Sequence, residues 1–220
     1  MSSPQVTLYT AAAPNGWPIS IFLEELGISY EAIKMSISDS DIGKVHNQVK
    51  SPWYLEINPN GRIAAITHNG FNVFETSAIL AYLQAEFDKE NKFGFSPVGN
   101  PKEYSEVLQW LCFAHGGIGP MQGQLGHFKM YAPEQIPYAQ NRYLNEVKRL
   151  YAVLDSRLAK HSYLAGDKYT IADIKAYGWV RLGVLFAERY GLDPNDWPHV
   201  KEWIDRIESR PAVQKGVKVP

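Results

Sequence analysis

The stretch from Ile57 to Leu83 constrains the fold most. It opens with a turn, Asn58-Pro59-Asn60-Gly61, because proline presets φ for a turn and Asn-Gly readily adopts left-handed backbone angles. Two short strands are expected next, at 63–67 and 71–74, because the Asn-Gly pair between them is typical of a hairpin. Apolar residues at helical spacing follow the second strand. The order turn, strand, hairpin, strand, helix predicts a mixed α/β unit.

Two polar residues stand where the second strand gives way to this helix, Glu75 and Thr76. A helix N-terminus presents unpaired N–H groups and a partial positive charge, so it binds anions. The hydroxyl of Thr76 adds a polar group, and the carboxylate of Glu75 can hold an ammonium. The pair suits a ligand with an α-amino and an α-carboxyl group. The alternative is that Thr76 caps the helix and Glu75 favours its first turn.

The residues before this stretch predict the other half of the same unit. Val6–Tyr9 is expected to be a strand, followed by a loop at 10–16 and a helix that stops at Gly27. A further strand is expected at 30–37. The resulting order is β-α-β, a polar excursion, then β-β-α. This is the thioredoxin-like order, and it predicts a four-stranded mixed sheet with helices on both faces.

The sequence pattern of the second half of the chain predicts helices throughout and no strands. Residues 88–102 are charged and then rich in Gly, Pro and Asn, which indicates a linker. We therefore expect a thioredoxin-like domain at 1–87, the linker, and a helical bundle domain at 103–220. The glycines and the proline within 116–120 are expected to break or kink a helix. Thr170 and Asp173 have the spacing of a capping box.

Composition and charge exclude several classes of function. The net charge of −1 gives no reason to expect nucleic acid or an anionic membrane as a partner. No signal-peptide pattern is visible, and no apolar run approaches the roughly 20 residues of a membrane span. A single cysteine cannot form an internal disulfide, and the six histidines lack metal-ligand spacing. We expect a cytoplasmic protein without a metal site.

Three stretches together resemble a known family: Asn58–Leu83, Pro14-Asn15-Gly16 and Leu108–Phe128. They are similar to glutathione S-transferases of the Ure2-type (fungal) and Nu-class group, and the resemblance covers nearly the whole chain. It implies that Glu75 and Thr76 hold the γ-glutamyl end of glutathione. It also implies that the backbone of Ile63 pairs with the cysteinyl part. The family has a cis-proline where this chain has Ala64, so the Ile63–Ala64 bond is either cis without proline or trans with a shifted loop.

The resemblance also implies a residue beside the glutathione sulfur, Asn15. An asparagine amide donates a hydrogen bond to a thiolate and so lowers its pKa, although it cannot act as a base. Bacterial relatives often carry threonine before the proline of this loop, where this chain has Ala13. That difference removes one hydroxyl donor. The alternative role of Asn15 is the N-cap of the following helix.

The remaining site residues also come from the resemblance. In the family the polar excursion meets the glycyl carboxylate of glutathione, and Gln48, Lys50 and Arg62 are the candidates. The Leu108–Phe128 run lines the second-substrate pocket, where the candidates are Trp110, His115, Met121 and Phe128. Arg142 is expected to meet a carboxylate of a second glutathione moiety. For each of these residues, core packing or a plain surface position is the alternative.

The resemblance implies an enzyme, a glutathione transferase or glutathione-dependent disulfide oxidoreductase. The expected chemistry is disulfide-bond reduction with glutathione as co-substrate, with transferase or peroxidase side activities. The expected partners are a small electrophile or disulfide and a second copy of the chain in a homodimer. Two alternatives remain open. One is a non-catalytic Ure2-like regulatory or binding protein, and the other is a pathway enzyme that conjugates glutathione to one reactive metabolite.

Overall fold

A computed structural model describes residues 5–220. The chain forms two compact units, each with its own core. The first unit contains the described residues up to Glu90 together with Arg210–Pro220, and the second contains Asn91–Ser209. Among the described residues, no helix combines the length and apolar character needed to cross a membrane.

The first unit is built on a four-stranded mixed sheet, as the sequence predicts. Its strands are β1 (Val6–Thr10), β2 (Tyr30–Lys34), β3 (Ala65–His68) and β4 (Phe71–Phe74). They lie in the order β2-β1-β3-β4, with β1 parallel to β2 and antiparallel to β3, and with β3 antiparallel to β4. Both residues of the β3–β4 turn, Asn69 and Gly70, have positive φ, at 50° and 78°. The Asn-Gly signal therefore identified this hairpin correctly.

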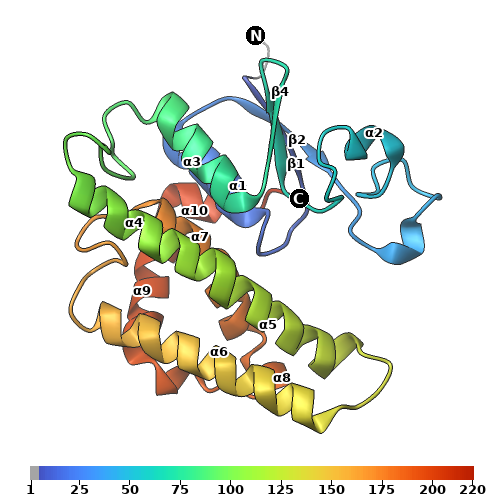
Figure 1. Cartoon of the computed structure of the whole chain (residues 1–220), viewed down its shortest axis with the longest axis vertical. Coiled ribbons are helices and arrows are strands. Elements are labelled where there is room, and N and C mark those ends of the chain that lie inside the picture. The colour runs from blue at the N-terminus through green and yellow to red at the C-terminus, as the bar shows by residue number, and fades with distance from the viewer. Residues whose placement is uncertain (1–4) are drawn as a thin grey trace. The chain divides into compact units, whose positions relative to one another are not determined.

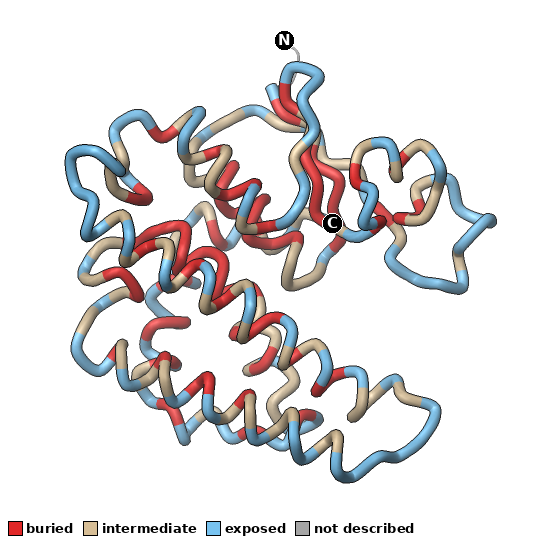
Figure 2. The backbone as a smooth tube through the Cα atoms, in the orientation of Figure 1, coloured by how far each residue is buried: buried red, intermediate tan, exposed pale blue. Residues whose placement is uncertain are grey.

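Helices cover both faces of this sheet (Figure 1). The first unit contains α1 (Trp17–Leu26), a 3-10 turn η1 (Asp39–Asp41), the short α2 (Pro52–Leu55), α3 (Thr76–Phe87) and α10 (Pro211–Gly216). Helices α1 and α3 lie on one side of the strands and the α2 segment on the other. Figure 2 shows buried residues along the strands and along α1 and α3. On the α2 side, the core contains Tyr9, Met35, Val49, Tyr54 and Ala65.

The C-terminal segment packs against α1. The hydroxyl of Ser20 donates to the carbonyl of Gly216 at 2.8 Å, and Arg210 forms two hydrogen bonds with Glu25, at 2.6 and 2.9 Å. A Cβ atom on Gly216 would lie 2.6 Å from the backbone of Ile21, so this close approach requires glycine. The structure thus places 210–220 with the first unit, whereas the helical pattern of the second half predicts them as part of the helical domain.

The second unit consists of helices and loops, as expected. Its elements are α4 (Pro101–Phe113), the π-helical turn η2 (Ala114–Ile118), α5 (Gly119–Gly126), a second π-helical turn η3 (His127–Tyr131), α6 (Pro137–Leu158), α7 (Ile171–Leu185), α8 (Ala187–Tyr190), a 3-10 turn η4 (Pro194–Asp196) and α9 (Pro198–Glu208). The capping box of α7 is confirmed, because Asp173 accepts from the backbone N–H of Thr170 at 3.0 Å.

The helix that begins at Pro101 continues through the glycines at 116 and 117 to Tyr131. The sequence predicted a break or a kink here; the helix does not break, and the irregularity takes the form of the π turn at 114–118. A π turn shifts the hydrogen bonding by one residue, and it lies next to Pro120, which has no N–H to donate. Such turns occur often at functional sites.

Candidate functional site

A hydrogen bond joins the loop before α1 to the N-terminus of α3. Thr76 is 4% exposed, and its hydroxyl donates to the backbone carbonyl of Asn15 at 3.1 Å. The N-cap of α1 is Gly16, and the N-cap of α3 is Glu75. Asn15 and Thr76 are therefore not the N-caps of their helices, so the capping alternatives for both residues are wrong. The structure instead brings the two predicted site residues together.

The position of Asn15 depends on Gly16. A Cβ atom on Gly16 would lie 2.3 Å from Oγ1 of Thr10 and 2.4 Å from the carbonyl oxygen of Ala11. The carbonyl of Ala13 accepts from the N–H of Gly16 at 2.9 Å and from that of Trp17 at 3.1 Å. Only glycine lets the loop close this tightly against β1. This close approach places Asn15 next to the N-terminus of α3.

Glu75 is exposed and has a backbone φ of +71°, which is uncommon for a residue with a side chain. Its carbonyl accepts the first helical hydrogen bond of α3, from the N–H of Ile79 at 2.9 Å. The preceding N–H groups of the first turn have no partner within the helix. Backbone strain of this kind is frequent at ligand sites. The carboxylate of Glu75 and the positive end of α3 thus lie side by side.

The turn at 58–61 brings two more side chains to this place. The amide Nδ2 of Asn60 donates to Oε1 of Glu75 at 3.4 Å, and the ammonium of Lys50 donates to the carbonyl of Asn60 at 3.0 Å. Lys50 was predicted as a site residue, but Asn60 was not. The sequence around Asn60 shows only a turn motif. Such a motif predicts the backbone conformation but not the side-chain contact with Glu75.

The three candidates for the glycyl carboxylate of a ligand differ in their environment. Gln48 is fully buried, and its amide is used within its own loop. Its Nε2 donates to the carbonyl of Ser38 at 3.2 Å, and its Oε1 accepts from the N–H of Lys50. Gln48 therefore supports the loop and does not face outward. The ammonium of Lys50 keeps further donors, and Arg62 is exposed.

The peptide bond between Ile63 and Ala64 is cis. This is one of the two alternatives that the sequence left open at the position where the family has proline. Ile63 is half-buried, and Ala64 is 2% exposed.

In the second unit, the candidates on the long helix do not converge. The ring of Trp110 lies 5.4 Å from that of Phe113, and Cζ of Arg157 lies 5.7 Å from the centroid of Trp110. The ring of Phe128 stacks on Tyr143 at 5.6 Å. Tyr143 and Arg157 stand near opposite ends of α6, so Trp110 and Phe128 are separated. Trp110 is half-buried, and these two contacts fit either packing within the unit or a pocket lining.

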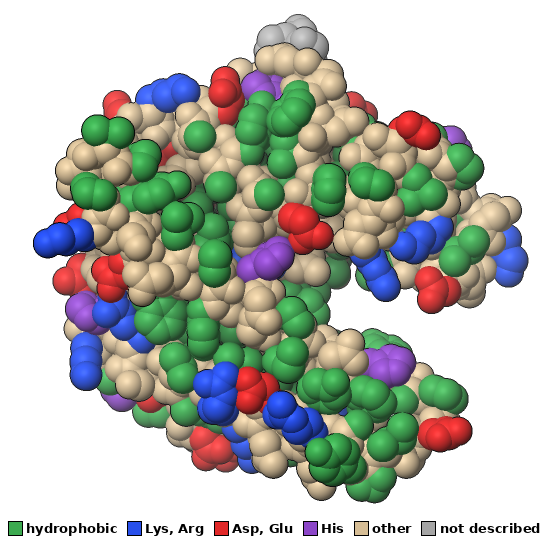
Figure 3. Space-filling view, in the orientation of Figure 1, with side chains coloured by type: hydrophobic (Ala, Val, Ile, Leu, Met, Phe, Trp, Pro, Cys, Tyr) green, Lys and Arg blue, Asp and Glu red, His purple; other side chains and the backbone are tan. Residues whose placement is uncertain are grey.

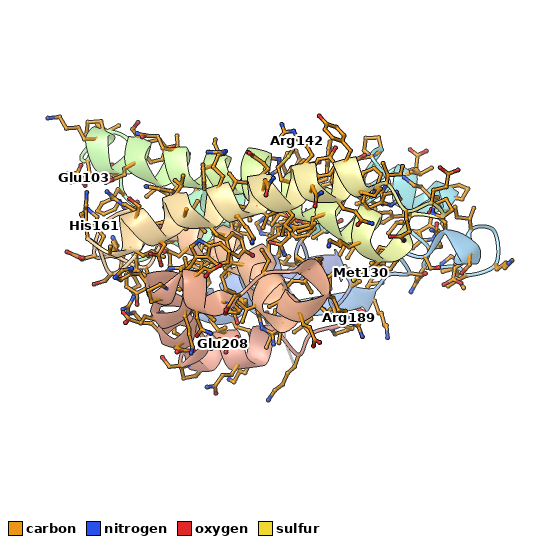
Figure 4. All side chains as sticks on the ribbon, turned by 90° about the horizontal axis from the view of Figure 1, so that it is seen from below. Glu103, Met130, Arg142, His161, Arg189 and Glu208 are labelled. Carbon is orange, nitrogen blue, oxygen red and sulfur yellow. The ribbon has the colours of Figure 1, made fainter. Side chains whose placement is uncertain are left out.

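The other candidates of this unit are partly accessible. His115 lies in the π turn η2 and is half-buried, as is Met121 on α5. The side chain of Arg142 is 60% exposed and lies 3.9 Å from the carboxylate of Glu146. It projects outward from α6 (Figure 4). Both its alternatives, a surface position and a ligand contact, fit this geometry.

Comparison with protein families identifies both halves of the chain. Residues 4–85 match the model of the glutathione S-transferase N-terminal domain, and residues 120–211 match that of the C-terminal domain. The chain belongs to the glutathione S-transferase family. The resemblance inferred from the sequence is therefore confirmed, as are the thioredoxin-like fold of the first unit and the helical second unit.

Relatives of this glutathione S-transferase are similar over almost its whole length. The disulfide-bond oxidoreductase YfcG of Escherichia coli is 40% identical over 219 residues, which cover 96% of this chain and 94% of the relative. A glutathione transferase homologue from Lodderomyces elongisporus, solved with two glutathione molecules per subunit, is 39% identical with a TM-score of 0.87 and full coverage of both chains. The Phanerochaete chrysosporium transferase URE2P6, solved with oxidised glutathione, is 38% identical with a TM-score of 0.87, covering 97% of this chain and 95% of its own.

Proposed function

We propose that this glutathione S-transferase reduces disulfide bonds, with glutathione as the co-substrate that supplies the reactive sulfur. One observation carries the proposal: the hydrogen bond from Thr76 to the Asn15 carbonyl. It fixes a candidate sulfur contact against a candidate amino-acid anchor. The relatives solved with reduced or oxidised glutathione, and the relative named as a disulfide-bond oxidoreductase, support the same reading.

The γ-glutamyl end of glutathione is assigned to the start of α3. The α-carboxylate binds the backbone N–H groups and the positive end of the helix. The ammonium binds the carboxylate of Glu75. The hydroxyl proton of Thr76 is directed at Asn15, but Oγ1 keeps lone pairs that accept a hydrogen bond from the same ammonium.

The glutathione sulfur is assigned to Asn15, whose side-chain amide donates to the thiolate. A donor of this kind stabilises the charged sulfur and lowers the pKa of the thiol. The backbone of Ile63 is assigned to the cysteinyl part. At the glycyl end, Lys50 and Arg62 remain the candidates, because Gln48 is used within its own loop.

The reaction proceeds by two thiol–disulfide exchanges. The thiolate of one glutathione attacks a sulfur of the substrate disulfide, forms a mixed disulfide and releases one substrate thiolate. A second glutathione thiolate attacks the glutathione sulfur of that mixed disulfide, which releases the second substrate thiolate and oxidised glutathione. Two glutathione molecules thus supply the two electrons, and each released thiolate takes up one proton. His115, Met121, Phe128 and Arg142 are the candidates for contact with the second molecule.

We also propose that the chain forms a homodimer through β4, one of the two edge strands of the sheet. Phe71 and Phe74 on this strand are 59% and 37% exposed, although both are large and apolar. Hydrophobic side chains gather over the β3–β4 hairpin (Figure 3). Exposed apolar residues on an edge strand are typical of an association surface. Sedimentation at several protein concentrations tests this: a monomer at all of them contradicts it.

The cytoplasm is the compartment proposed for this reaction. Disulfide reduction consumes reduced glutathione, and the cytoplasm is where glutathione and thioredoxin keep thiols reduced.

A calorimetric titration with reduced and oxidised glutathione tests the proposal, together with turnover on a small disulfide. We expect saturable binding that is lost in Glu75→Ala. Asn15→Ala should reduce turnover by about tenfold or more and affect binding less, because the lost donor acts on the thiolate. Equal loss of both contradicts the assigned role of Asn15. Binding without any turnover would favour the regulatory alternative, and absence of binding to the folded protein would overturn the proposal.

A further inference from the structure

Two buried side chains converge on one backbone carbonyl beside the proposed site. The hydroxyl of Tyr54 and the amide Nδ2 of Asn58 each donate a hydrogen bond to the carbonyl oxygen of Arg62, both at 2.7 Å. Tyr54 is fully buried and Asn58 is 2% exposed. Both lone pairs of this oxygen are therefore occupied, and the orientation of the Arg62 carbonyl is fixed from two sides.

The two donors are themselves held in place. The ring of Tyr54 contacts Tyr9 and Trp53, at centroid distances of 5.8 and 5.7 Å. Oδ1 of Asn58 accepts from the N–H of Asn60 at 3.0 Å, which determines which end of its amide faces Arg62. Burial raises the pKa of Tyr54 to about 12, so its hydroxyl carries its proton and donates throughout the neutral range.

A fixed carbonyl at Arg62 also fixes the next N–H. The peptide unit is planar, and in a trans unit the N–H of Ile63 points opposite to the carbonyl of Arg62. The carbonyl points toward buried Tyr54 and Asn58, so the N–H points away from them. Among the residues that the structure describes, this N–H has no hydrogen-bond partner. A backbone N–H is a strong donor that is almost always paired, so this group is suited to a ligand acceptor.

We propose that Tyr54, together with Asn58, is a positioning residue that directs the N–H of Ile63 at the amide carbonyl of the cysteinyl part of glutathione. Neither side chain touches the ligand in this arrangement. They act through the Arg62 carbonyl and set the angle at which the peptide of Ile63 meets the bound molecule. The inference rests on the proposed function, since it concerns the same site and the same ligand.

Tyr54→Phe tests this, because it removes one hydroxyl and keeps the packed ring. The matched control is Tyr9→Phe, a neighbouring ring in the same cluster whose hydroxyl does not reach Arg62. We expect Tyr54→Phe to weaken glutathione binding and raise KM by about three- to tenfold, with kcat at saturating glutathione unchanged. Tyr9→Phe should leave both unchanged. Thermal unfolding of each variant identifies any general loss of stability.

The second readout is the amide resonance of Ile63 in isoleucine-labelled protein, titrated with S-methylglutathione as an unreactive probe. In the wild type, a ligand carbonyl that accepts from this N–H should shift the resonance strongly. In Tyr54→Phe the shift should be smaller at saturation. Asn58→Asp, which keeps the acceptor for Asn60 and loses the donor to Arg62, should reproduce the effect if Tyr54→Phe does not fold.

The outcomes separate the two proposals. If the wild type binds glutathione and both variants match it in KM and in the Ile63 shift, the positioning role is overturned while the proposed function stands. If KM rises in the Tyr9→Phe control by as much as in Tyr54→Phe, the effect belongs to the aromatic cluster and the inference is also overturned. If the wild type binds neither reduced nor oxidised glutathione, the proposed function itself fails.

Discussion

The hydroxyl of Thr76 donates to the backbone carbonyl of Asn15 at 3.1 Å, across 61 positions of sequence. The contact joins the loop that would hold the glutathione sulfur to the helix that would hold its amino-acid end. Because the acceptor is a backbone atom, the identity of the side chain at position 15 does not affect it. The two proposed functions, anchoring and sulfur activation, can therefore be altered separately.

Replacing Thr76 by valine should weaken both glutathione binding and turnover, because it removes the hydroxyl but keeps the branched shape. Loss of one such hydrogen bond costs about 0.5–1.5 kcal/mol, so we expect affinity to fall by about two- to tenfold. Thr76→Ser keeps the hydroxyl and should retain most of it. Calorimetry on the three proteins is the measurement. Equal affinities in the valine and serine variants would show that the hydrogen bond from Thr76 to the Asn15 carbonyl does not contribute to glutathione binding.

The strained backbone of Glu75 predicts opposite effects on stability and on binding. Its φ of +71° is unfavourable for any residue with a Cβ atom and costs about 1–3 kcal/mol. Glu75→Gly should therefore raise the melting temperature by a few degrees, at about 2–4 °C per kcal/mol, while glutathione binding is lost.

The matched control for this prediction is Glu75→Ala. It also removes the carboxylate but keeps a Cβ atom at the same positive φ. We expect it to lose binding without the gain in melting temperature. If the alanine and glycine variants melt at the same temperature, the positive φ at position 75 does not lower the stability of the folded protein.

A histidine in the second unit, His199, should make the stability of the protein depend on pH. Asp155 on α6 accepts from the backbone N–H of His199 at 2.8 Å and of Val200 at 3.1 Å, and its other oxygen lies 2.9 Å from Nδ1 of His199. This hydrogen bond to Asp155 raises the pKa of His199, and the charge of Glu202 adds to the effect. The carboxylate thus joins the start of α9 to α6 and holds the imidazolium.

Because the folded state raises this pKa, the stabilisation is fully present below the unfolded value of about 6.5 and is lost as pH rises through the folded value. We expect His199→Gln to lower the melting temperature more at about pH 5.5 than at about pH 8.5. The backbone contacts of Asp155 remain in this variant. Asp155→Asn should lower the melting temperature at both pH values. If His199→Gln lowered the melting temperature by the same amount at both pH values, the charged imidazolium would not contribute to stability.

Local chemistry explains what the sequence predicted well. The β4 strand was predicted with the bounds that the structure has, Phe71–Phe74, because an Asn-Gly turn and a following helix delimit it. The capping box at Thr170 was found for the same reason, since all its partners lie within four residues. The junction of strand and helix at Glu75 and Thr76 was also predicted from one short stretch.

Features that depend on distant packing were not predictable in this way. The contact between Ser20 and Gly216 spans 196 positions, and no local pattern near position 216 indicates it. The side chain of Gln48 has an amide that could bind a ligand carboxylate. The fold of its loop turns this side chain inward, where it donates to the carbonyl of Ser38. The break or kink expected at 116–120 would have let Trp110 and Phe128 approach each other, whereas the continuous helix keeps them about 27 Å apart along its axis.

A buried polar contact in the second unit gives a last prediction. The hydroxyl of Tyr151 donates to Oε1 of Gln122 at 2.7 Å, and Nε2 of Gln122 donates to the carbonyl of Trp179 at 2.8 Å. A Cβ atom on Gly183 would lie 2.0 Å from the Tyr151 hydroxyl. Gly183→Ala should therefore destabilise the protein by about 1–3 kcal/mol through overpacking.

Three further variants make this prediction specific: Gly116→Ala, Tyr151→Phe and the double variant of Gly183 and Tyr151. Gly116→Ala lies in the same unit with no atom within 4 Å of the added Cβ, and it should be neutral or slightly stabilising. The double variant Gly183→Ala/Tyr151→Phe removes the clashing oxygen, so its loss in unfolding free energy should be smaller than the sum of the two single losses. Denaturant unfolding of the wild type, Gly116→Ala, Gly183→Ala, Tyr151→Phe and the double variant measures these free energies. Strict additivity would mean that the alanine at 183 is accommodated by a shift of α7, with the Tyr151–Gln122 contact left intact.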